Sequence, residues 1–95
     1  MPWFVKTEVF KEPRNEIKLF LEAHQTWINE LQAGGRVALS GFLVSNERSP
    51  GGGLLLFYAR NYSEAKALVE QDPLIVNGCV KWELHEWVGA INTTS

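Results

Sequence analysis

The order of hydrophobic periodicities along the chain limits its fold more than any other feature of the sequence. Four segments have the apolar pattern of β-strands, and they are residues 3–10, 36–44, 54–59 and 79–88. Two further segments, with apolar residues three and four positions apart, predict helices after the first and third strands. The first helix ends at Gly34 and Gly35, because glycine accepts the left-handed conformation at a helix end. The second ends at Asp72, because a residue before proline disfavours helical geometry.

The predicted order β-α-β-β-α-β favours a ferredoxin-like sandwich of the α+β class. A right-handed crossover at each helix gives a four-stranded antiparallel sheet with both helices on one face. A chain of 95 residues has room for one core, so we expect a single domain over residues 1–95. Strand residues such as Trp3, Val5 and Trp82 are apolar in both side-chain directions. The second sheet face is therefore too apolar for water, which predicts a homodimer packed sheet against sheet.

The composition argues against several classes of function. The net charge is −2 at pH 7 without a run of basic residues, so we expect no nucleic-acid partner. The chain has no apolar stretch of about 18 residues and no signal-peptide pattern, which predicts no membrane partner and a cytoplasmic location. The lone Cys79 and two histidines far apart in sequence predict no metal site.

An ionisable residue interrupts the apolar stripe of each predicted helix. His24 lies in the stripe of the first helix, whose apolar members are Ile17, Phe20, Leu21, Trp27, Ile28 and Leu31. Asp72 continues the second stripe after Ala65, Leu68 and Val69. Since both helices pack on the same side of the sheet, the two residues are predicted to pair.

A paired histidine and aspartate have a defined chemistry. The carboxylate fixes the tautomer of the imidazole, and the other ring nitrogen becomes an oriented base for a bound substrate. The group that gives up its proton would be a substrate hydroxyl, a water or Ser40. The alternative is that the pair only satisfies itself in the core, or that Asp72 is a turn device at a helix end.

Three other features have simpler interpretations. The predicted strand order is also that of RNA-recognition domains, but leucines occupy residues 54–56, where base-stacking aromatic rings would be needed. The glycines at 51–53 lack the Gly-Lys-Ser/Thr of a phosphate loop and predict a flexible hairpin, with a lid over a pocket as a further possibility. His85, on the last strand, is expected to be exposed.

The sequence also resembles the YciI-like (YCII-related) domain family from the first strand to about residue 87. The resemblance is carried by His24, Leu31, Gly35-Arg36, Ser40-Gly41, Asp72-Pro73, Glu83 and Trp87. It implies the fold of the dimeric α+β barrels, whose ferredoxin-like protomers join through their sheets. It also implies a catalytic dyad of His24 and Asp72, with Ser40 and Gly41 bordering the substrate pocket.

These observations predict a small-molecule enzyme without a cofactor. Lyase-like relatives imply proton abstraction from a small organic substrate, with His24 as base or acid and Asp72 as its orienting partner. The alternative function is a non-catalytic domain that binds a small ligand or is purely structural. A third class, a haem- or oxygen-using barrel, would need a pocket able to hold its cofactor. A solvent-connected pocket at the His24 ring favours the enzyme, and a sealed ring favours a structural pair.

Overall fold

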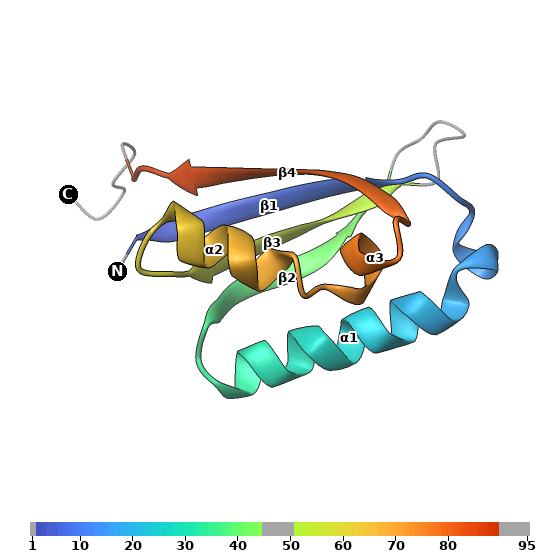
Figure 1. Cartoon of the computed structure of the whole chain (residues 1–95), viewed down its shortest axis with the longest axis horizontal. Helices are drawn as coiled ribbons and strands as arrows, with labels where there is room; N and C mark the ends of the chain where they lie inside the picture. The colour runs from blue at the N-terminus through green and yellow to red at the C-terminus, as the bar shows by residue number, and fades with distance from the viewer. Residues whose placement is uncertain (1, 45–50, 90–95) are drawn as a thin grey trace.

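The computed structural model describes residues 2–44 and 51–89. Their strands and helices, in chain order, are β1 (Trp3–Phe10), the single 3-10 turn η1 (Arg14–Glu16), α1 (Lys18–Ala33), β2 (Val37–Leu43), β3 (Gly52–Tyr58), α2 (Tyr62–Val69), α3 (Pro73–Val76) and β4 (Val80–Trp87). The four strands form one antiparallel sheet in the order β2-β3-β1-β4, and the helices lie on one side of it (Figure 1). The predicted ferredoxin-like fold is confirmed. β1 and β3 are the central strands, which explains why β3 is apolar in both side-chain directions.

The second predicted helix differs from the structure at its end. It is divided in two, because α2 ends at Val69 and Asp72 precedes a separate short helix, α3. Asp72 has the extended conformation that a following proline favours, with φ −60° and ψ 124°, and Pro73 occupies the first turn of α3. Asp72 therefore comes from the start of α3, not from the inward stripe of α2.

Two of the three glycines at 51–53 do not lie in the predicted hairpin loop. Gly52 and Gly53 are buried in β3, so the prediction is wrong for these two, while Gly51 precedes the strand with a φ of 82°. Residues 45–50, the rest of the predicted loop, lie outside the described residues. A Cβ atom on Gly52 would lie 1.8 Å from the carbonyl oxygen of Glu8 on β1. A Cβ atom on Gly53 would lie 3.0 Å from the Oε2 atom of the Glu8 side chain. The glycines allow β1 and its Glu8 side chain to approach β3 closely.

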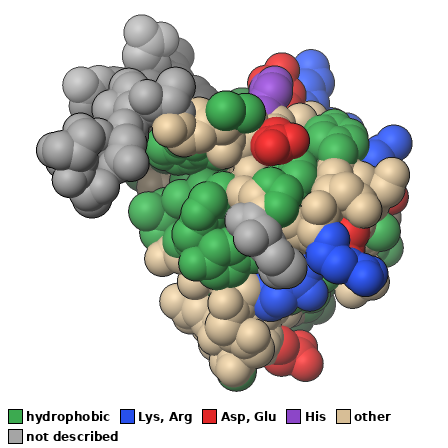
Figure 2. All heavy atoms as spheres, turned by 90° about the vertical axis from the view of Figure 1, so that its left-hand side faces the viewer, with side chains coloured by type: hydrophobic (Ala, Val, Ile, Leu, Met, Phe, Trp, Pro, Cys, Tyr) green, Lys and Arg blue, Asp and Glu red, His purple; other side chains and the backbone are tan. Residues whose placement is uncertain are grey.

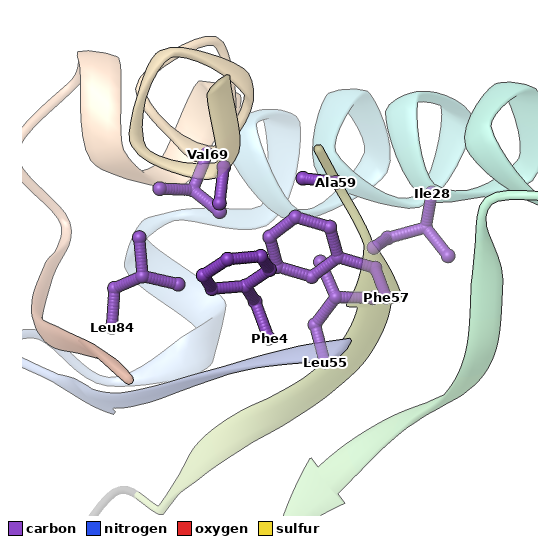
Figure 3. Close-up of a cluster of buried hydrophobic side chains, with 8 residues drawn as sticks. Phe4, Ile28, Leu55, Phe57, Ala59, Val69 and Leu84 are labelled. Carbon is purple, nitrogen blue, oxygen red and sulfur yellow. The ribbon is translucent and has the colours of Figure 1, made fainter. Parts of the chain in front are cut away.

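The core beneath the helices consists of two apolar clusters. The larger cluster contains Phe4, Ile28, Leu55, Phe57, Ala59, Ala65, Val69 and Leu84 (Figure 3). The smaller cluster contains Phe10, Ile17, Leu74, Cys79 and Val80. On β1, Phe4 belongs to the first cluster and Phe10 to the second, while the two buried residues between them are Lys6 and Glu8. The two apolar clusters are therefore separated along β1 by charged residues.

The sheet face opposite the helices, called the outer face here, is not covered by any other part of residues 2–44 and 51–89. Its exposed apolar side chains include Val9, Leu39, Leu43 and Trp87, each 45% to 53% exposed. Figure 2 faces one end of the strands and shows hydrophobic side chains gathered on the left, with Lys and Arg side chains on the right. Among the described residues, none of the helices combines the length and apolar character needed to cross a bilayer.

Candidate active site

β1 brings two charged side chains into the interior. Side chains alternate between the two faces of a strand, so Phe4, Lys6, Glu8 and Phe10 all point toward the helices. Lys6 is 1% exposed and Glu8 is 3% exposed. Buried charges need partners, and the Lys6 Nζ atom donates to the Glu8 Oε1 atom at 2.5 Å.

Asp72 connects β1 to α1 and α3. Its Oδ2 atom accepts a hydrogen bond from Lys6 Nζ at 2.9 Å. Its Oδ1 atom lies 2.8 Å from His24 Nδ1 and accepts the backbone N–H of Leu74 at 2.9 Å. The Leu74 bond makes Asp72 the N-cap of α3, so the predicted turn role and the predicted pairing with His24 occur in one fully buried side chain. Lys6, Glu8, His24 and Asp72 are called the polar tetrad below.

The surroundings of Asp72 keep its carboxyl group ionised. Burial raises the pKa of Asp72, but the hydrogen bond with His24 and the charge of Lys6 together lower it more, so the pKa lies below the ordinary value of 3.8. An ionised carboxylate can only accept hydrogen bonds. Nδ1 of His24 is therefore the donor to Asp72, which leaves Nε2 to act on other groups.

A pocket of about 280 Å³ lies beside the tetrad, between α1 and the sheet. Its polar lining residues are Lys6, Glu8, His24, Gln25, Gln32 and Ser40, and Gly41 and Gly53 contribute to its wall. His24 is 7% exposed. Within the described residues, His24 Nε2 makes no hydrogen bond and no buried side-chain nitrogen or oxygen lacks a partner. Nε2 is thus open to solvent on the pocket side of the ring.

The structure brings together the four residues that the sequence predicts for the site. His24 and Asp72 are in contact, and Ser40 and Gly41 border the same pocket as His24. His85 is exposed on β4, as expected. Lys6 and Glu8 were not predicted from the sequence. They alternate with Phe4 and Phe10 at every second position of β1, and this spacing places all four side chains on one face of the strand.

The described part of the chain has no group of three or more His, Cys, Asp or Glu side chains arranged to hold a metal ion. The tetrad itself contains a lysine ammonium bonded to both carboxylates. Its members are therefore hydrogen-bonded to one another, and three of them, Lys6, Glu8 and His24, line the pocket while Asp72 lies behind them.

Comparison with known proteins identifies the family. The model of the YCII-related domain matches residues 5–88. The chain belongs to the YCII-related domain family. A search of curated proteins gives no match for this YCII-related chain.

Solved structures with the same fold include two enzymes. The first is the 5-chloro-2-hydroxyhydroquinone dehydrochlorinase TftG from Burkholderia phenoliruptrix AC1100, in complex with 2,5-dihydroxybenzoquinone. It is 17% identical, with a TM-score of 0.71 over 90% of this chain and 93% of that chain. The second is SnoaB, a cofactor-independent oxygenase from Streptomyces nogalater, which is 5% identical with a TM-score of 0.58 over 98% of this chain and 96% of that chain.

A dimeric ferredoxin-like protein from an uncultured marine organism is also similar. It is 16% identical, with a TM-score of 0.56 over 98% of this chain and 100% of that chain. At these identities, the three structures establish the shared fold of the YCII-related chain.

The Asp72→Asn substitution tests the importance of the buried carboxylate. We expect the free energy of unfolding at pH 7 to fall by about 3 kcal/mol, because a charged partner of Lys6 is lost from the interior. The folded-state pKa of Asp72 is lowered, so its stabilisation is complete above about pH 3.8 and is lost as the pH falls through the folded-state value. Urea denaturation between pH 2 and pH 7 should show this acid-dependent loss in the wild type and a smaller one in the variant.

Glu70→Gln is the matched control, because Glu70 is an exposed carboxylate at the end of α2. It should change the free energy of unfolding by less than about 0.5 kcal/mol. Equal stability of Asp72→Asn and the wild type at pH 7 would contradict the role given to Asp72.

Proposed function

We propose that this protein is an enzyme that transfers a proton on a small hydroxylated ring compound, with His24 as the general base and no cofactor. The observation that carries the proposal is the contact between His24 Nδ1 and Asp72 Oδ1 at 2.8 Å, with the rest of the ring beside a pocket. Asp72 is the positioning residue. It holds the Nδ1–H tautomer, so that the Nε2 lone pair is available to a bound molecule.

The charges of the tetrad favour proton uptake by His24 during such a reaction. With a neutral imidazole, Lys6 contributes one positive charge, and Glu8 and Asp72 contribute two negative charges. Adding a proton to His24 brings this buried group to neutrality. The developing imidazolium is also held directly against the Asp72 carboxylate.

The pocket size supports a small substrate. A volume of about 280 Å³ lies just below the usual range for ligand pockets, which is about 300–1,000 Å³. Ser40, Gln25 and Gln32 supply hydrogen-bonding groups for ring substituents, and Gly41 leaves the wall near Ser40 free of a side chain. A dehydrochlorinase of a hydroxylated ring and a cofactor-independent oxygenase share the fold, which supports this class of chemistry.

A non-catalytic domain is the second candidate, because a hydrogen-bonded pair can serve the fold alone. In that case the pocket would bind a ligand without changing it. Opening of the pocket beside His24 favours the enzyme over a sealed structural pair. The two candidates differ in whether a bound ring compound exchanges its protons.

The test uses 2-hydroxyhydroquinone and 5-chloro-2-hydroxyhydroquinone under nitrogen in D2O. Wild-type protein should accelerate deuterium entry at the ring carbons of the first compound, and chloride release from the second. His24→Gln should lower either rate about a hundredfold or more, because the base is lost. The unfolding curve of the variant shows whether its fold is retained.

The same substitution at the other histidine, His85→Gln, is the control. His85 is exposed on β4 and does not line the pocket, so activity should stay within about twofold of the wild type. If wild-type protein accelerates neither reaction, or if His24→Gln retains full activity, the proposed function is wrong.

We further propose that two copies associate through their outer faces, which gives the dimeric α+β barrel expected from the resemblance. In a single chain the outer face exposes an apolar surface to water, formed by Val9, Leu39, Leu43 and Trp87. A protein described as a dimeric ferredoxin-like protein shares the fold, which supports the same arrangement. An interface between two identical faces is the commonest symmetry for a homodimer.

Size-exclusion chromatography with light scattering measures the molar mass of the protein in solution, and so tests this association. The wild type should have the mass of two chains, and Val9→Glu should shift it to one chain, because a charge would be buried in the interface. Val76→Glu, at an exposed apolar position on α3, should remain a dimer. A monomeric wild type at micromolar concentration would overturn the proposed dimer.

A further inference from the structure

We propose that Glu8 is a second catalytic residue, which exchanges a proton with the substrate at the opposite end of the tetrad from His24. This inference rests on the proposed function and names the group that completes its chemistry. When a hydroxyl oxygen and a ring carbon lie on opposite sides of a ring, one side chain cannot reach both, so one group removes a proton and another delivers one. His24 can supply only one of these at a time.

Glu8 is placed to meet the same bound molecule as His24. Both side chains line the pocket, one from β1 and one from α1. The Oε1 atom of Glu8 accepts a hydrogen bond from Lys6 Nζ, while its Oε2 atom lies beside Gly53 on the pocket wall. A side chain at position 53 would crowd Oε2, because a Cβ atom there would lie 3.0 Å from it.

The second carboxylate oxygen lies at the wall of the pocket. The Glu8 side chain is 1% exposed and lines the pocket. Its Oε2 atom makes no hydrogen bond within residues 2–44 and 51–89, where every fully buried side-chain oxygen has a partner, so Oε2 is not completely buried. His24 Nε2 and Glu8 Oε2 are thus the two open ends of a chain of hydrogen bonds. The chain passes through Asp72 and Lys6.

With a neutral imidazole, the formal charges of the tetrad sum to one negative charge, which a single transferred proton would balance. Lys6 already has the Asp72 carboxylate as a counter-ion, so the Glu8 carboxylate leaves a buried excess of one negative charge. A purely structural pairing would not need this second carboxylate, since an unbalanced buried charge is destabilising. One added proton gives neutrality whether it resides on His24 or on Glu8. With the proton on Glu8, Glu8 is the acid and His24 is the base, and with the proton on His24 the two roles are reversed.

The two ends allow a balanced reaction on a hydroxylated ring. With the proton on Glu8, His24 Nε2 removes the hydrogen of a ring hydroxyl, and that O–H electron pair forms a carbonyl. A ring π-electron pair then forms a C–H bond with the proton delivered by Glu8 Oε2. The proton has moved from Glu8 to His24, the charge of the tetrad is unchanged, and exchange with solvent restores the starting state. Where chlorine is on the newly protonated carbon, a second ring hydroxyl then gives its proton to the Glu8 carboxylate and its O–H electron pair forms a second carbonyl. The adjacent ring double bond shifts toward the chlorinated carbon, and chloride leaves with the C–Cl electron pair.

The experiment compares Glu8→Gln with the wild type, His24→Gln and the control Glu86→Gln. Glu86 is an exposed carboxylate on β4 outside the pocket. Deuterium entry into 2-hydroxyhydroquinone under nitrogen is followed from pH 5 to pH 9. We expect Glu8→Gln to be about a hundredfold slower, and Glu86→Gln to be within about twofold of the wild type. The pH–rate profile should change from bell-shaped in the wild type to a single limb in Glu8→Gln, which a structural role would not produce.

Glu8→Asp provides a second variant if Glu8→Gln does not fold. It keeps the negative charge beside Lys6 but withdraws the carboxylate by one methylene group, so exchange should again be slowed at least tenfold. If His24→Gln is inactive while folded Glu8→Gln and Glu8→Asp retain the wild-type rate and profile, the role of Glu8 is wrong and the proposed function stands. If the wild type does not promote exchange, the proposed function itself fails.

Discussion

The carboxylate of Asp72 is the interaction on which the arrangement of this protein depends. It accepts hydrogen bonds from a β1 side chain, an α1 side chain and the first turn of α3. These contacts fix where α3 begins and how α1 lies over the sheet. They also determine which nitrogen of His24 faces the pocket. Because both oxygens accept hydrogen bonds and the pKa of Asp72 is lowered, the group is a negative charge inside the fold at neutral pH.

The polar tetrad is poorly explained by stability alone. A chain of 95 residues buries roughly two-thirds or less of its unfolded surface, so each buried position matters for its stability. Replacing buried ion pairs with apolar residues of similar volume is often neutral or stabilising, by up to about 4 kcal/mol. Here Lys6 and Glu8 divide the core into two apolar clusters. Violations of core patterning are expected at functional sites, and this one borders the pocket.

The sequence predicts the sheet, the two crossover helices and the inward position of His24, because hydrophobic periodicity reports which face of each element is buried. It also predicts the His24–Asp72 contact, although Asp72 reaches His24 from the start of α3 and not from the stripe of α2. Pro73 predicts an end of the second helix at Asp72, but the sequence does not predict the earlier end at Val69 or the short helix α3, which begins with the capping bond from Leu74 to Asp72. Glycines 52 and 53 suggest a loop, yet they lie in a strand. The absence of their side chains allows the backbone and side chain of Glu8 on β1 to lie close to β3. Such a contact lies between residues more than forty positions apart, which local pattern does not report.

The tautomer of the His24 ring tests the role of Asp72 most directly. Two-bond ¹H–¹⁵N correlation spectra distinguish a proton on Nδ1 from a proton on Nε2 in a neutral imidazole. Because the Asp72 carboxylate can only accept a hydrogen bond, we expect the Nδ1–H tautomer for His24, with Nε2 unprotonated. A neutral His24 found as the Nε2–H tautomer would show that Asp72 does not orient the ring and that the proposed site is wrong.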